Sequence, residues 1–347
     1  HDVDTRQKFC TLIFTSGSEY SNNLLAKFHQ IDDQNLTDFR STAFEYKSDL
    51  LDLSLNRLSS FLECDGEITQ KILLKLFKFP LLDSEQWNFH TQSSEFHMTK
   101  NQNLFHTSKI GFPLYKGETM EQFTHTFATP AYWIEEKVGT DFLKNKEFGR
   151  IKKYKQNVEP RIASDDYRLV WRALTNFSNR RTLISTILPP NVFLGHSLNF
   201  LKPLIFDGKK YIKPLSYEET IFVCGMFNSF PVDFILRHRI LTNLTLSFIK
   251  ELPIPKFDKN NSLHQKIFKN SSMLICTTDD YSKLRADVGI SKFVTDSNER
   301  NTLEAQINAC AAKIYDLNTE ELEYILSTFT IISQEFKELT LNEFSLL

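Results

Sequence analysis

Side chains with the chemistry to bind nucleic acid are concentrated in the middle of the sequence. Arg168 and Arg172 lie four residues apart in the run Y-R-L-V-W-R, and Arg180 and Arg181 follow a polar stretch that ends at Asn179. A guanidinium group matches a phosphate or the edge of guanine with two parallel hydrogen bonds, and asparagine or glutamine matches adenine. If the first run is helical or turn-like, its two arginines share one face.

The same part of the chain is strongly basic. Residues 137–181 contain six lysines and six arginines against five acidic residues, a net charge of +7, whereas the whole chain of 347 residues carries -2. A local positive surface on an acidic body favours a partner with dense negative charge, such as the backbone of DNA. Two alternatives stay open: an ordinary solvated surface, or pairing of Arg168 and Arg172 with acids such as Asp165 and Asp166.

The sequence contains no self-sufficient catalytic constellation. A Gly-rich cofactor turn, a Walker loop, zinc-ligand spacing and G-x-S-x-G are all absent. The Pro189–Pro190 pair lacks the polar and aromatic neighbours of the [DNS]-P-P-[YFW] motif of amino methylases. Glu45-x-Lys47 fits the E-x-K tripeptide of metal-dependent nucleases, which is common by chance. We therefore predict no catalytic residue, metal or cofactor in this chain, and keep residual nuclease activity at Glu45 and Lys47 as an alternative.

The elements that must position these residues follow a mixed helical and extended pattern, which predicts an α/β (α+β) fold. Apolar residues at helical spacing predict helices over 69–79 and 218–228, with a break at 229–231 before a further helix. Three helices are predicted after residue 296, the first two beginning with the capping-box spacings Asp296-x-x-Glu299 and Asn318-x-x-Glu321.

Extended segments and loops are predicted between these helices. Residues 8–14 are β-branched and aromatic, which is typical of a buried strand, and residues around 87–96 alternate like a second strand. The run 252–255 must be extended because each proline restricts itself and the residue before it. Residues 256–280 are polar and predict a linker with short elements.

Composition limits the class of protein. The chain has 31 phenylalanines and only 10 glycines, which favours well-packed cores. The five scattered cysteines contain no C-x-x-C and indicate buried free thiols in a reducing, cytoplasmic location. We find no signal peptide and no long apolar run, and expect no membrane partner. The chain begins at His1, and we interpret it as a fragment of a longer protein.

Several motifs occur in an order that is typical of one family. They are D-V-D-T-R-Q-K-F-C at the start, W-N-F with F-H-M-T-K, P-L-Y-K-G-E-T-M-E-Q-F, Y-R-x-x-x-R with R-T-L-I and L-P-P, N-S-F-P-V-D, and F-I-x-x-L-P-I-P. With the closing helices, they resemble the C-terminal part of bacterial type IIG restriction–modification enzymes and of large adenine methyltransferases of phage-defence systems. The chain departs from the family at Lys116, Thr119 and residues 124–126.

This resemblance implies a target-recognition (TaqI-like specificity) domain that binds double-stranded DNA. It would position an adenine for flipping and N6 methylation by an upstream methylase domain of the same polypeptide. That domain would use S-adenosylmethionine, with Mg²⁺ if a nuclease is attached. Residues 1–18 would complete the methylase sheet, 19–255 would form the recognition domain, and 256–347 would form a linker and C-terminal helical unit.

The residues predicted to contact DNA come from the basic segment and from the motifs. They are Lys116, Gln122, Lys152, Lys153, Arg168, Arg172, Asn179, Arg180 and Arg181. A protein-interaction or scaffold module stays open as an alternative, because the net charge is close to zero and phenylalanine is abundant.

Overall fold

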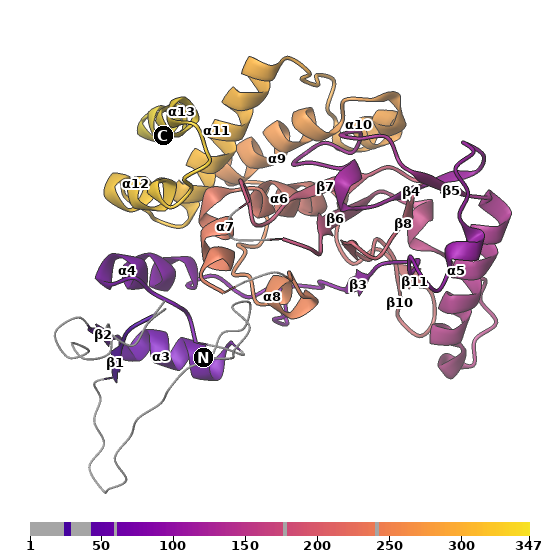
Figure 1. Cartoon of the computed structure of the whole chain (residues 1–347), viewed down its shortest axis with the longest axis horizontal. Coiled ribbons are helices and arrows are strands. Elements are labelled where there is room, and N and C mark those ends of the chain that lie inside the picture. Colours follow the sequence, from indigo (N-terminus) through magenta and orange to yellow (C-terminus); the bar gives the residue numbers. More distant parts are fainter. Residues whose placement is uncertain (1–23, 29–42, 59–60, 176–178, 240–242) are drawn as a thin grey trace, which may run out of the picture.

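The computed structural model describes residues 24–28, 43–58, 61–175, 179–239 and 243–347. Helices and small sheets are mixed along these residues, so the predicted α/β fold is confirmed (Figure 1). The strand predicted over 8–14 and the proposed methylase segment 1–18 lie outside the described residues.

A four-stranded antiparallel sheet lies at the centre of the molecule. Its order is β3 (Thr91–Ser93), β9 (Leu198–Leu201), β6 (Arg168–Arg172) and β7 (Ser185–Leu188). Successive side chains of a strand point to opposite faces. The sheet therefore separates a large core on the side of α6 (Tyr217–Phe227) from a smaller core on the other side. The strand predicted over 87–96 is shorter in the structure and covers only β3.

The run Y-R-L-V-W-R forms strand β6, which corrects the expectation of a helix or turn. Leu169 and Trp171 face the large core, and Val170 faces the smaller one. Arg168 and Arg172 still share a face, because residues four apart in a strand also point the same way. Residues 168–172 form a strand and not a helix or turn because nearly the whole segment is buried, and a central strand covered on both faces carries apolar residues in succession.

A second layer carries the first part of the basic segment, in α5. Strands β5 (Tyr132–Ile134), β4 (Phe112–Tyr115) and β8 (Phe193–Leu194) form a three-stranded sheet in which β4 and β8 are parallel. Helix α5 (Glu136–Ile151) packs on it around a third core, which contains Phe193 and Leu143. Gly139 permits this contact, because a Cβ there would lie 2.4 Å from the Phe193 ring.

Next to α5 lies a short hairpin (Figure 1, lower right). It consists of β10 (Ile205–Phe206) and β11 (Tyr211–Ile212), and the 3-10 helix η3 (Lys152–Tyr154) directly follows α5. The remaining 3-10 helices are η1 (Gln102–Leu104), η2 (Gly117–Thr119), η4 (Ala163–Asp165) and η5 (Asp279–Tyr281).

The predicted break after residue 228 separates α6 from α7 (Phe230–Arg237). Pro231 lies in the first turn of α7, where its missing N–H costs no hydrogen bond. Both helices are largely buried in the large core. Among the described residues no single helix is long and apolar enough to cross a membrane, and α6 and α7, bent by 60°, meet those criteria only as a pair.

The C-terminal part is helical, as predicted. It contains α8 (Leu246–Lys250), α9 (Ser262–Ile275), α10 (Ser282–Val288), α11 (Ser297–Ile314), α12 (Thr319–Ser327) and α13 (Gln334–Ser345). The side chain of Asp296 caps α11, and Asn318 and Glu321 form the predicted capping box of α12. The linker predicted over 256–280 is wrong where α9 forms, because Ile267, Leu274 and their neighbours bury an apolar helix face against α6 and α11.

The N-terminal elements contact this helical part through α4. They are β1 (Leu24–Ala26), β2 (Phe44–Tyr46), α3 (Ser48–Asn56) and α4 (Glu67–Leu76). Lys75 of α4 forms an ion pair of 2.7 Å with Glu321 of α12, and the hydroxyl groups of Thr69 and Tyr324 lie 2.9 Å apart. The large core accordingly extends from Tyr46 to Phe344.

Candidate nucleic-acid interface

Arg168 is part of the protein core. Its side chain is 0% exposed, and its Nη1 donates to Oε1 of Glu95 at 2.5 Å, while its Nη2 donates to the carbonyl of Val192. The other carboxylate oxygen of Glu95 accepts from the amide of Leu194 at 2.9 Å. The prediction that Arg168 contacts DNA is therefore wrong, and its acidic partner is Glu95 rather than Asp165 or Asp166.

Arg181 is buried in the same way. Its Nε donates to Oδ2 of Asp233 at 2.8 Å, its Nη2 donates to the carbonyl of Asn228, and its guanidinium lies 4.2 Å from the centroid of the Phe230 ring. Asp233 is 0% exposed and also accepts from the amide of Thr182. The predicted DNA contact at Arg181 is wrong as well, because this side chain joins the chain after β6 to helix α7.

Arg172 and Gln122 are half-buried and already hydrogen-bonded. Arg172 Nη2 donates to the carbonyl of Met120 and to Oε2 of Glu121, the latter at 3.1 Å. Gln122 Nε2 donates to the carbonyl and Oδ1 of Asn228 at 3.3 and 3.2 Å. These bonds fix the loop that follows η2. A contact of either residue with DNA stays a prediction.

Arg180 and Asn179 are exposed, as a DNA contact requires. The guanidinium of Arg237 donates to both of their backbone carbonyls, at 3.2 and 2.8 Å respectively, so this edge of the loop is anchored while the side chains face solvent. Lys116 lies elsewhere, in an ion pair of 2.6 Å with Glu118 and 5.8 Å from the centroid of the Tyr132 ring. The structure thus distributes the predicted residues over several places.

Lys152 and Lys153 of η3 are exposed and lie close to further exposed lysines in sequence and in the fold. With Lys155, Lys209 and Lys210 they form what we call the basic platform, in which three exposed lysines come from η3 and its end and two from the hairpin. Lys209 and Lys210 were not among the predicted contacts because they lie outside the basic residues 137–181. The turn signal D-G-K-K between two short apolar pairs could have located them.

The hairpin holds its two lysines in a defined turn. The amide of Asp207 donates to the carbonyl of Lys210 at 3.1 Å, and Oδ1 of Asp207 accepts from the amides of Lys209 and Lys210, both at 2.8 Å. Gly208 has a φ of +103°, which a residue with a side chain rarely adopts. The backbone at the two lysines is therefore ordered before any partner binds.

Tyr154 joins the two halves of the basic platform. Its ring lies 5.4 Å from that of Phe206, and a Cβ at Gly208 would lie 3.3 Å from it, so η3 and the hairpin are in direct contact. Lys153 Nζ lies 4.9 Å from the centroid of the Tyr154 ring, which is itself 40% exposed. Lysines around an exposed aromatic ring suit a nucleic acid, because the charges attract phosphates and the ring can stack.

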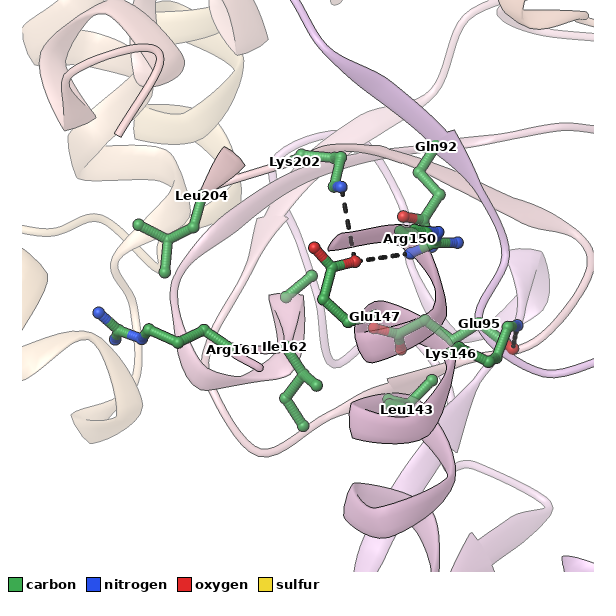
Figure 2. A pocket seen from close by; sticks show the side chains of 11 residues that line it. Gln92, Glu95, Leu143, Lys146, Glu147, Arg150, Arg161, Ile162, Lys202 and Leu204 are labelled. Atoms are coloured by element: carbon green, nitrogen blue, oxygen red, sulfur yellow. Dashed lines mark hydrogen bonds and ion pairs between the residues drawn. The ribbon is translucent and has the colours of Figure 1, made fainter. Parts of the chain in front are cut away.

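A small pocket lies between α5, the residues at the start of η4, and the edge of the central sheet at Gln92 and Lys202 (Figure 2). Glu147 lies at its centre and accepts from Nη1 of Arg150 at 3.0 Å, while Nζ of Lys202 lies 3.8 Å away. Tyr211 of β11 donates to its other oxygen at 3.5 Å. Burial lowers the pKa of Lys202 and Glu147 opposes this shift. This network is structural, since the cavity of about 20 Å³ has room for a single water.

Glu304 of α11 lies near the anchored loop. Burial raises the pKa of its carboxyl group, although the charges of Arg300, Arg180 and Arg181 oppose the shift. Ionisation of Glu304 is thus less favourable in the folded protein than in the unfolded chain.

We expect Glu304→Gln to raise the free energy of unfolding at pH 7. A carboxyl group whose pKa is raised by folding binds more protons in the folded state than in the unfolded state. The free energy of unfolding therefore falls as the pH rises from the unfolded pKa to the folded pKa. The gain of the variant should be largest above the folded pKa and should disappear below the unfolded value near 4.3. Urea unfolding from pH 4 to 8 measures this difference, and a gain that does not depend on pH would contradict it.

Within the described residues, no group of three or more histidine, cysteine, aspartate or glutamate side chains could hold a metal ion. Glu45 is exposed on β2, and the amide of Lys47 donates to the side chain of Gln70. The four described cysteines, Cys64, Cys224, Cys276 and Cys310, are buried and free, as predicted. These residues give no support to the nuclease alternative.

No protein-family model matches the sequence, and no curated protein matches it either. Among solved structures, the chain is similar to the type IIL restriction–modification enzyme MmeI in complex with DNA, with a TM-score of 0.32 and 10% identity. The alignment covers 75% of this chain and 35% of that chain.

Proposed function

We propose that this chain is a DNA-binding part of a restriction–modification protein. The observation that carries the proposal is the basic platform: five exposed lysines on two packed elements, of which Lys153 lies over the exposed ring of Tyr154. Such a surface attracts the DNA backbone through the release of condensed counterions. The motif order described above supports the restriction–modification context.

The finer parts of the proposal come from the resemblance of the sequence. The chain would act as a TaqI-like target-recognition domain of a cytoplasmic adenine-N6 methyltransferase, next to an upstream catalytic domain that uses S-adenosylmethionine. The basic platform would contact phosphates. Arg180 and Asn179, whose side chains face solvent on an anchored loop, are the better candidates for base contacts.

The test removes the charges of the basic platform. We expect the variant with all five lysines replaced by glutamine to lose about tenfold in DNA affinity at 0.1 M salt for each lysine that contacts a phosphate. The slope of log K against log[salt] should decrease by about one for each such lysine. Fluorescence anisotropy with a labelled duplex at several salt concentrations measures both quantities.

A matched variant controls for net charge. Lys71, Lys78, Lys269, Lys283 and Lys292 are also exposed but lie on or near other helices, and their replacement by glutamine makes the same change in total charge. We expect this variant to bind DNA with nearly the original salt slope. Equal losses in both variants would show that only net charge matters, and DNA binding that is independent of salt in the original chain would favour the scaffold alternative.

A further inference from the structure

A cleft of about 520 Å³ lies next to the basic platform, with which it shares Lys209 and Lys210. Its cationic lining comes from three segments: Lys144 of α5, Arg161 before η4, and Lys209 and Lys210 of the hairpin. The hydroxyl-bearing Tyr211 also lines it, with Glu159 and Asp165 as the acidic members. Four positive charges against two negative ones leave the cleft with a net positive charge.

The positive charges of the cleft are only partly neutralised. Lys144 pairs with Glu159 at 2.7 Å, but the carboxylate is 80% exposed, and an exposed pair of this kind contributes little energy and is easily exchanged. Asp165 accepts from the amide of Ile162 at 3.4 Å. No described carboxylate lies within ion-pair distance of Arg161, Lys209 or Lys210, so these three cations are available to a ligand.

The walls of the cleft are held in place from behind. Tyr211 donates to Glu147 on α5, and the turn at Asp207 fixes the backbone of Lys209 and Lys210. A guanidinium group with a planar fork and two lysines on a fixed turn match the tetrahedral oxygens of a phosphate. The volume is in the range of small-molecule sites and exceeds the need of one isolated phosphate ion.

We propose that the cleft of Lys144, Arg161, Lys209 and Lys210 binds a phosphate group that belongs to a larger molecule. Two sources share this chemistry: a backbone phosphate of DNA and the polyphosphate of a free nucleotide. The DNA source rests on the proposed function, since Lys209 and Lys210 belong to both the cleft and the basic platform, whereas the nucleotide source does not.

The test uses the full chain and the variant Lys144→Gln/Arg161→Gln, which changes the cleft and leaves the basic platform intact. The probes are inorganic triphosphate and ATP, measured by calorimetry at 0.15 M salt, and a DNA duplex, measured over a range of salt concentrations. Lys269→Gln/Lys283→Gln is the matched control, and circular dichroism checks that each variant is folded. If a nucleotide is the source, we expect the cleft variant to lose at least tenfold in affinity for triphosphate and ATP.

If DNA is the source, the original chain does not bind the small probes at this salt concentration, and the cleft variant lowers the DNA salt slope by one to two. The proposal is overturned if the cleft variant binds every probe as the original chain does, or if the original chain binds none of them. If the chain binds no nucleotide and the cleft variant binds DNA like the original chain, the phosphate site in the cleft is refuted while the proposed DNA-binding function stands. If the chain binds nucleotide in the cleft but binds no DNA, the proposed function is refuted while the phosphate site in the cleft stands.

Discussion

Arg168→Ala is expected to lower the free energy of unfolding by about 3–5 kcal/mol. The substitution leaves the carboxylate of Glu95 in the core without its cation and leaves the carbonyl of Val192 without a donor. Removal of one partner of a buried ion pair is costly because the remaining charge cannot be solvated. Urea unfolding followed by circular dichroism measures the change.

The double variant Arg168→Met/Glu95→Leu separates charge from packing. It removes both charges and should recover part of the loss, although the amide of Leu194 then lacks its acceptor. Arg180→Ala is the exposed control and should change stability by no more than about 0.5 kcal/mol. If Arg168→Ala were as mild as Arg180→Ala, the burial of Arg168 would be wrong and its role in DNA binding would be open again.

Asp233→Ala should have a loss of similar size, about 3–5 kcal/mol. The fully buried carboxylate is 2.8 Å from Arg181 and 3.7 Å from Arg237, and it accepts from the amide of Thr182. Its removal leaves Arg181 buried beside Phe230 without the carboxylate to which its Nε donates. Thermal and urea unfolding measure the loss.

Asp233→Asn tests how much of this loss comes from the charge. It keeps the size of the side chain and one acceptor oxygen, so we expect an intermediate loss. Asp279→Ala is the matched control, because Asp279 is fully exposed and lies 3.8 Å from Arg285; its effect should be small. Equal stability of Asp233→Ala and Asp279→Ala would contradict the assignment of Asp233 to the core.

Elements with strong local signals could be predicted from the sequence. The break between α6 and α7 follows from Pro231, and the start of α12 follows from the capping box of Asn318 and Glu321, because both act within one helical turn. Helix α9 was missed because its polar residues dominate the composition of the segment. Its apolar face is completed only by packing against α6 and α11.

The burial of two predicted DNA contacts could not be read from local sequence. Arg168 is paired with a residue 73 positions away and Arg181 with one 52 positions away, so the partners meet only in the folded chain. The same holds for the basic platform, whose two segments, η3 and the hairpin, meet only because Tyr154 packs on Phe206 and Gly208. A count of charge over residues 137–181 could identify three of the five lysines but not Lys209 and Lys210.

The pairing of Arg168 with Glu95 has a consequence for the layer that carries α5 and the hairpin. Arg168 belongs to the central sheet, whereas Glu95 is bonded to Leu194 of the second sheet, so a buried ion pair joins the two sheets beside the smaller core, where Leu194 packs with Val170 and Phe200. Apolar surfaces tolerate sliding, but hydrogen bonds with fixed directions do not. If the chain binds DNA as proposed, we expect this ion pair to fix the orientation of the layer that carries α5 and the hairpin, so that substitutions at Arg168 or Glu95 change how the lysines meet the duplex without contacting it.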